Sequence, residues 1–278
     1  MSDSAYDVIL APARTGPSRT SRFAGRSVRV LAPAAVAAVL ILTWQLWVEL
    51  GDVSPIVLPS PSSVAARMWD QWAVLSPEAW VTIREIVYGF VIAAIFGFGC
   101  AVLIVAWRPI ELTVYPILVA SQVIPKIAIA PLIFIWFGLS FTARVIIIVM
   151  LAFFPIVIAS VIGLKSVNQT TLHLARSTGA SAFTTFVKIK IPAAMPDVFG
   201  GLKLAATRVV GAAIVAETIS AGEGLGRAIF LATYELRPDI ALAGIGYLVV
   251  IGLVFFFAVA LAERLIIPWH VSVRGTHR

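Results

Sequence analysis

The sequence predicts an all-α, polytopic membrane protein with six transmembrane helices. Of its 278 residues, 60% are hydrophobic and only 13% are charged, whereas a soluble domain averages roughly 45–50% and about 25%. The mean hydropathy of +0.99 agrees with this composition. The apolar residues extend from about position 30 to about position 268 and so are not confined to one anchor. These observations exclude a water-soluble enzyme and a disordered chain.

Six segments are apolar enough to cross the hydrocarbon core, which takes about 20 residues without an unpaired charge. Four are free of charge: 30–48, 86–107, 145–164 and 240–262. A further span, 112–143, is interrupted only by Lys126. The weakest, 198–221, contains Lys203, Arg208 and Glu217. In chain order these last two are the third and fifth predicted spans.

The distribution of basic residues predicts the orientation. If the N-terminus is cytoplasmic, most of the 21 Lys and Arg residues fall on the inner side, as the positive-inside rule requires. Lys126 and Arg144 belong to the minority outside that side. We therefore expect a multi-pass protein of the cell (inner/plasma) membrane with both termini cytoplasmic. The net charge of +7 then needs no nucleic acid partner.

Three regions follow from this pattern. Residues 1–29 are polar and basic and predict a flexible cytoplasmic tail. Residues 30–268 form the transmembrane domain, and 269–278 form a cytoplasmic C-terminal tail. A cleaved signal peptide is the alternative at the N-terminus, but the first apolar run is longer than a typical signal core.

The longest cytoplasmic loop, 165–197, is more than a connector needs. Helical spacing predicts one short helix over 168–178, which Gly179 ends. A second is predicted over 182–189, stopped by Pro192 and Pro196 before the chain re-enters the membrane. Such a pair suits a groove on a soluble partner. A hairpin packed on the protein's own base is the equal alternative.

The same loop resembles the EAA loop of binding-protein-dependent ABC importer permeases. That motif reads Glu-Ala-Ala, three residues, Gly, nine residues, then Ile-x-Leu-Pro. Ala175, Gly179, Ile189 and Pro192 occupy the expected positions, whereas His173 replaces the glutamate and Leu174 the first alanine. The resemblance implies an ATPase-coupling loop that comprises His173, Leu174, Ala175, Arg176, Gly179, Ala180, Ile189 and Pro192.

The resemblance extends over roughly residues 55–268. The runs 58–62, 125–138, 153–156 and 222–226 are similar to the nitrate, sulfonate and taurine importer subfamily. It implies a MetI-like ABC permease fold, a homodimer of permeases, two copies of an ATP-binding subunit and an extracytoplasmic substrate-binding protein. The solute is then of the nitrate, sulfonate, taurine, pyrimidine or riboflavin class. The 125–131 run favours a small heterocyclic vitamin or precursor, whereas Lys126 suits an anion.

Ionisable residues within spans normally face a partner or a watery pathway. Lys126 lies 14 residues after Leu112, and Glu217 lies 14 residues after Lys203, which places both about 21 Å into the membrane. We expect the third and fifth helices to pack together, with Lys126 and Glu217 paired or sharing a polar cavity. A buried structural ion pair is the alternative to a pathway role. Pro125 adds a bend, as a gate or as a static kink.

The chain shows no catalytic constellation. It has no GxxxxGK[ST] phosphate loop, so ATP hydrolysis would belong to a separate subunit. Its single cysteine, Cys100, excludes a disulfide framework, and its three histidines form no metal motif. We therefore expect no catalytic residue, metal or cofactor. The alternative function is a stand-alone secondary transporter that uses Lys126 and Glu217 for ion coupling, although no internal repeat supports it.

Overall fold

The computed structural model describes the backbone of residues 19–269 and the side chains of residues 32–269. Most of the predicted N-terminal tail and nearly all of the predicted C-terminal tail lie outside these residues. Within them, five helices are long and apolar enough to cross a membrane, or six if one bent pair counts as a single span. The predicted all-α membrane fold is therefore confirmed.

The chain divides into two compact units, Met1–Ser54 and Pro55–Arg278. The first contains α1 (Arg19–Leu50), which begins before the predicted start of the first span at residue 30. Its apolar stretch, Ala32–Leu50, is long and apolar enough to cross a membrane. Leu40 and Trp47 are examples of its largely exposed side chains, which suit a helix surrounded by lipid.

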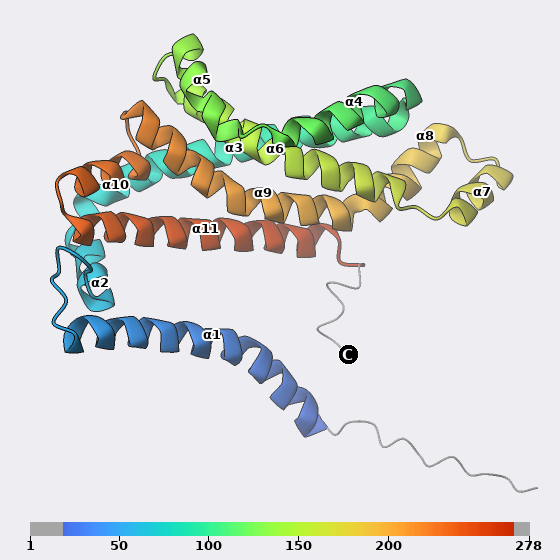
Figure 1. Ribbon diagram of the computed structural model, residues 1–278. Coiled ribbons are helices and arrows are strands. Elements are labelled where there is room, and N and C mark those ends of the chain that lie inside the picture. The colour runs from blue at the N-terminus through green and yellow to red at the C-terminus, as the bar shows by residue number, and fades with distance from the viewer. Residues whose placement is uncertain (1–18, 270–278) are drawn as a thin grey trace, which may run out of the picture. The chain divides into compact units, whose positions relative to one another are not determined.

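The second unit contains the other helices and all four hydrophobic clusters. Its α-helices are α2 (Pro61–Asp70), α3 (Trp72–Ala106), α4 (Arg108–Ala120), α5 (Ala130–Phe137), α6 (Phe141–Lys165), α7 (Gln169–Ser177), α8 (Ala182–Thr185), α9 (Ile191–Ser220), α10 (Leu225–Tyr234) and α11 (Pro238–Ile266). Three short segments complete it: η1 (Ser121–Val123) and η2 (Lys126–Ile129), both 3₁₀, and the π-helical η3 (Phe186–Lys190). In Figure 1, α10 and α2 lie at one end of this unit, and α7 and α8 lie at the other.

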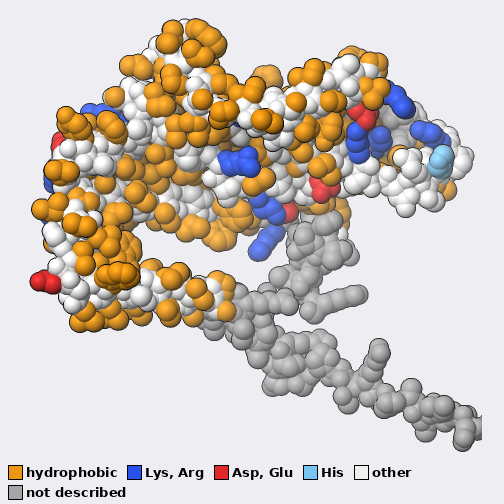
Figure 2. Space-filling view, in the orientation of Figure 1, with side chains coloured by type: hydrophobic (Ala, Val, Ile, Leu, Met, Phe, Trp, Pro, Cys, Tyr) orange, Lys and Arg blue, Asp and Glu red, His pale blue; other side chains and the backbone are white. Residues whose placement is uncertain are grey.

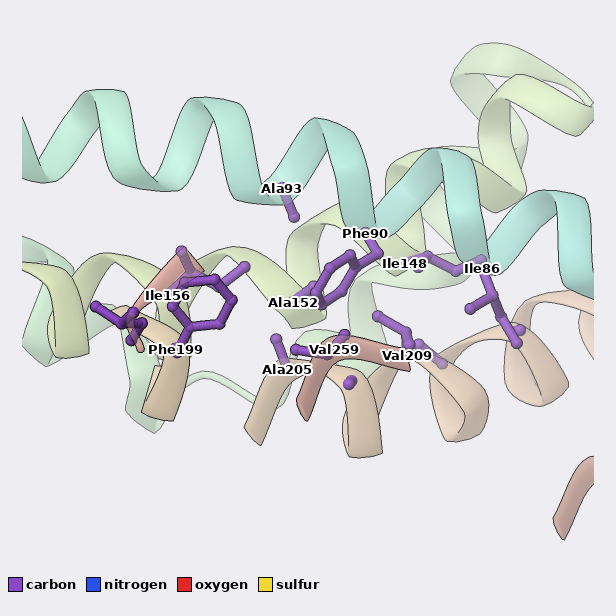
Figure 3. Packing of buried hydrophobic residues seen from close by; sticks show 14 residues of the cluster. Ile86, Phe90, Ala93, Ile148, Ala152, Ile156, Phe199, Ala205, Val209 and Val259 are labelled. Atoms are coloured by element: carbon purple, nitrogen blue, oxygen red, sulfur yellow. The ribbon is translucent and has the colours of Figure 1, made fainter. Parts of the chain in front are cut away.

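The core lies where α3, α6 and α9 run side by side (Figure 3). Ile86 and Phe90 of α3 meet Ile148 of α6, and Val209 of α9 closes the same cluster. α11 adds Val259 to the same cluster. Few polar side chains interrupt these contacts, so van der Waals packing between helices holds the unit together, as expected where lipid is no less apolar than the core.

Small residues bring α3 and α6 close together at Gly89 and Gly97. A Cβ on Gly89 would lie 2.7 Å from Cβ of Ile148, and one on Gly97 would lie 3.1 Å from Cγ2 of Ile156. Gly99 is different: nothing lies within 4 Å of its would-be Cβ. Gly89 and Gly97 are therefore packing sites between the two helices, and Gly99 is not.

The third predicted span is not one straight helix. The segment Arg108–Val123 and the segment Lys126–Phe137 are bent by 86° relative to each other. Pro125 lies at the break with an extended backbone (φ −68°, ψ 97°). Pro131 lies in the first turn of α5, where a missing N–H leaves no helical hydrogen bond unmade. The expected bend at Pro125 is confirmed, and it is sharp enough to redirect the chain.

The fifth predicted span starts earlier than the sequence indicates. Pro192 and Pro196 do not stop a helix: Pro192 lies in the first turn of α9 and Pro196 lies inside it. The preceding η3 is a π-helical turn, and its wider winding joins α8 to α9 without a break. The apolar span therefore runs from Ala182 to Ser220.

Candidate functional site

The end of the bundle opposite α10 carries the segment that the EAA-loop resemblance singles out, here called the α7–α8 segment (residues 168–192). The side chain of Asn168 accepts a hydrogen bond from the Thr170 N–H at 2.9 Å and so caps α7. At the other end, the Ala180 N–H donates to the Ala175 carbonyl and the Gly179 N–H to the Arg176 carbonyl, both at 3.0 Å. This is a Schellman motif, and Gly179 has the positive φ it needs (77°).

The two faces of α7 differ. Leu172 and Ala175 are buried, so the helix packs against its own protein as one of the two predicted alternatives requires. Leu174 and Phe183, in contrast, are 65% and 77% exposed. Lys and Arg side chains gather around this end of the molecule (Figure 2). The segment is thus anchored on one side and presents apolar side chains with a basic rim on the other.

The remaining residues of the coupling motif lie around this anchored helix. His173 and Arg176 are exposed on α7, and Ala180 is half-buried after it. Ile189 and Pro192 are half-buried where η3 joins α9. α8, η3 and α9 form one continuous helical stretch, whereas a turn around Gly179 separates α7 from it.

A second group of functional interest is a buried polar cluster near the α10 end. Arg144 of α6 forms an ion pair with Glu85 of α3, with Nε 2.5 Å from Oε1. Both side chains are almost fully buried, and Glu217 of α9 is fully buried beside them. One oxygen of Glu85 and one of Glu217 have no hydrogen-bond partner among the described residues. Such a cluster is costly in an apolar bundle unless it has a structural or functional role.

This cluster holds the N-terminus of α10. Glu217 Oε2 accepts from the Gly226 N–H at 2.6 Å, and Thr82 Oγ1 accepts from the Leu225 N–H at 3.0 Å. Glu78 accepts from the Gly224 N–H at 2.5 Å. Carboxylates are favourable at a helix N-terminus because free N–H groups and the helix dipole meet there. Side chains from α3 and α9 therefore fix the turn 222–226 and the helix that follows.

The predicted pairing of Lys126 with Glu217 is wrong. Lys126 Nζ lies 4.3 Å from the centroid of the Phe154 ring, whereas Glu217 binds the Gly226 N–H near the end of α9. The depth estimate failed because the third span breaks at Pro125, so residues counted from Leu112 do not advance along one axis. The expected packing of the third span on the fifth is confirmed for its second half, since Ile133 and Phe134 of α5 share a cluster with Ala216 of α9.

Instead, Lys126 borders a cavity of about 250 Å³ at the break. Its lining comes from the bent span and from the middles of α6 and α9: Gln122, Ile124, Pro125, Lys126, Ile127, Leu151, Phe154 and Arg208. Pro125 and Lys126 thus line the same cavity, and Glu217 does not belong to it.

Sequence reasoning missed the partners of these charges. Arg144 was assigned to the outer basic residues, yet it is buried with Glu85, which lies 59 positions away. Glu85 directly precedes the charge-free run 86–107, so the pattern does not place it inside a span. A weak signal existed, because Arg144 also directly precedes an apolar run, 145–164. In the predicted topology the second and fourth spans both begin on the outer side, so opposite charges at their starts are candidates for an ion pair.

The fold and these sites define a class of protein: a multi-span membrane component with a short helical segment exposed at one end. The family model of the "Binding-protein-dependent transport system inner membrane component" matches residues 82–268. The chain belongs to this family. The match runs from α3 to α11 and includes the α7–α8 segment and the turn before α10.

Individual relatives agree with the family. A probable ABC transporter permease protein of Haemophilus influenzae is 32% identical over 232 residues, which cover 84% of this chain and 95% of the relative. The formylaminopyrimidine transport permease ThiX of Halalkalibacterium halodurans is 31% identical, with 88% and 98% covered. The riboflavin transport permease RibX of Chloroflexus aurantiacus is 30% identical, with 84% and 88% covered.

A solved structure shares the fold. It describes inward-facing conformations of the MetNI methionine ABC transporter and superposes with a TM-score of 0.58, covering 75% of this chain and 99% of the other. The sequences are only 18% identical, so this likeness concerns the fold alone. The expected MetI-like fold is confirmed.

Proposed function

We propose that this chain is the permease subunit of an ATP-driven importer of the inner membrane. Two copies enclose the translocation pathway, and two ATP-binding subunits dock on the α7–α8 segment from the cytoplasm. An extracytoplasmic substrate-binding protein delivers the solute at the α10 end. Named relatives transport riboflavin, formylaminopyrimidine, taurine or aliphatic sulfonates, so the solute class proposed here is a small molecule of this range.

The exposed surface of the α7–α8 segment is the observation that carries this proposal. Leu174 and Phe183 project from short helices that are firmly capped and anchored by Leu172 and Ala175. A rigid, basic-rimmed apolar projection matches the helix-in-groove mode of recognition. Because the π-turn η3 continues into α9, closure of the ATP-binding subunits would move α9 and the buried core with it.

The pathway proposal rests on the break in the third span. Pro125 and Lys126 line the cavity there, while Glu217 acts at the α10 end by holding the turn 222–226. We therefore propose that Pro125 and Lys126 belong to the pathway or gate and that Glu217 positions the outer end. Ion coupling by a Lys126–Glu217 pair, as a stand-alone transporter requires, has no support in this geometry.

Co-purification tests the docking proposal. The permease is expressed with its ATP-binding subunit, and Leu174→Glu and Phe183→Glu are compared with the wild type. We expect both variants to lose the bound subunit and its permease-stimulated ATP hydrolysis, because a carboxylate would have to be desolvated in the groove. Tyr234→Glu, on an 82% exposed residue of α10, is the matched control and should retain both. Solute uptake by the permease alone in ATP-free vesicles would contradict the proposal.

A further inference from the structure

The cavity at the break of the third span contains two basic side chains and no acidic one. Lys126 of η2 and Arg208 of α9 both line it. Neither forms an ion pair with any acidic side chain of the described residues. Nearby basic residues do form such pairs, as Lys203 with Glu263 and Lys165 with Glu111 show. The cavity is therefore a locally positive site, because no acidic side chain lines it.

The position of the cavity along the helices indicates what the charges of Lys126 and Arg208 face. Phe154 lies near the middle of α6 (Phe141–Lys165), and Arg208 lies near the middle of α9 (Ile191–Ser220). A cation at such a depth is costly when it faces lipid and is normally found against a partner or a water-filled passage. The backbone at the break is non-helical, which at membrane depth is tolerated where it lines a cavity.

The lining also limits what the site can hold. Its volume is about 250 Å³, slightly below the roughly 300–1,000 Å³ typical of pockets for drug-sized ligands. Phe154 carries Lys126 over its ring face, and this contact holds the ammonium at the cavity while leaving its N–H donors free. Arg208 supplies a planar fork of donors that suits two oxygens of one acidic group.

From this geometry we propose that Lys126 and Arg208 form an anion-binding site within the pathway, so that the solute carries a carboxylate, sulfonate or phosphate group. The proposal rests on the proposed permease function and narrows it to small organic anions. Lys126 and Arg208 neutralise the acidic group as it passes, while Phe154, Leu151 and Ile127 contact its apolar part. A phospholipid head group has the same chemistry, so the test separates the two sources.

Cysteine labelling measures the charge of the cavity directly. The assembled transporter is studied in phosphatidylcholine nanodiscs. Cys100→Ser first removes the only native thiol of this chain, and Gln122→Cys then adds one at the cavity. Its rates with an anionic sulfonatoethyl and a cationic trimethylammonioethyl methanethiosulfonate are compared, with Tyr234→Cys as the reference for reagent reactivity. We expect the anionic reagent to be favoured about ten-fold, and the preference to vanish when Lys126→Gln and Arg208→Gln are added.

Protection from labelling identifies the ligand class. Methanesulfonate should slow the reaction of Gln122→Cys, whereas dimethyl sulfone, a neutral molecule of nearly equal size, should not. Equal protection by both would overturn the proposal, as would equal rates for the two reagents. Loss of the methanesulfonate effect when phosphatidylglycerol is added to the nanodisc would assign the site to lipid. None of these outcomes depends on ATP hydrolysis, so a failure here is distinguishable from failure of the permease function.

Discussion

Glu85 and Arg144 are the two residues whose interaction determines most about the interior of the bundle. They join α3 to α6 by an ion pair that is nearly inaccessible to solvent. A buried pair contributes little net stability compared with apolar residues of the same size, but the loss of one partner leaves an isolated buried charge. The pair therefore fixes which faces of the two helices meet.

A double-mutant cycle tests this role. Arg144→Met alone and Glu85→Leu alone should each lower the free energy of unfolding by about 3–5 kcal/mol, because each leaves a buried charge unpaired. The double variant should be close to the wild type. Thermal unfolding of the detergent-solubilised protein gives the comparison. Additive effects of the two single substitutions would show that the residues do not act as a pair.

Gly224 is a position where both the backbone conformation and the close packing require glycine. Its φ is +109°, and a Cβ would collide with the carboxyl group of Glu217. Gly224→Ala should therefore displace Glu217 from the N-terminus of α10 and cost about 2–4 kcal/mol through backbone strain and overpacking. Faster hydrogen exchange at the amides of Leu225 and Gly226 is the expected observation. Gly211→Ala, where nothing lies within 4 Å, should leave these rates unchanged.

At the scale of elements, the π-turn η3 determines how the α7–α8 segment is oriented on α9. A π-turn contains one residue more than an α-helical turn and is found mostly at functional sites. Its extra residue rotates everything that precedes it about the helix axis by about 100°. Pro192 lies two residues after its end, so the turn also accommodates a residue that cannot donate a backbone hydrogen bond.

Deletion of the exposed Lys188 should convert η3 into a regular α-helical turn. We expect the variant to fold, since Lys188 has little packing, and to lose stimulation of ATP hydrolysis because Leu174 and Phe183 then face another direction. Lys188→Ala retains the turn and should behave as the wild type. ATP hydrolysis and thermal unfolding, measured on the same preparations, separate the two effects. Full stimulation in the deletion variant would show that η3 does not orient the segment.

The broken third span is the other element-scale feature. Pro125 predicts a bend in this span, and local chemistry explains its position and that of Pro131. The direction of α5 after the break depends on contacts that are distant in sequence. Ile133 and Phe134 pack on Ile147 of α6, and Ala216 of α9 belongs to the same cluster. The sequence therefore predicted the bend and the neighbouring span, but not the partner of Lys126, which is Phe154 of α6.

At the scale of the whole molecule, the proposed orientation places the α7–α8 segment in the cytoplasm and α10 outside. Ser177→Cys and Tyr234→Cys, each with Cys100→Ser, test this at the two ends of the bundle. A membrane-impermeant maleimide should label Tyr234→Cys in intact cells and Ser177→Cys only after permeabilisation. Labelling in the reverse order would place the coupling segment on the wrong side and contradict both the topology and the docking proposal.

Much of the architecture was predictable because it depends on residues that are close together in the sequence. Charge-free runs of sufficient length mark α6, α11 and the second half of α3, which begins at Trp72 and not at residue 86. The spacing around Gly179 defines α7 and its cap. The motif in the α7–α8 segment also indicated the family, and the family model that matches residues 82–268 confirms it. The start of α9 was not predictable in this way, since Pro192 and Pro196 indicate a stop unless the π-turn before them is known.

What the sequence by itself determined is thus the class of protein, its spans and its exposed helical segment, since each depends on the order of neighbouring residues along one helix. Only the tertiary structure decided which charges meet. Arg144 forms an ion pair with Glu85, and Glu217 accepts a hydrogen bond at the N-terminus of α10. Lys126 lines a cavity together with Arg208. The physical reason is that helix periodicity sets the direction of a side chain within its own helix. The neighbour it reaches depends on how separate helices pack.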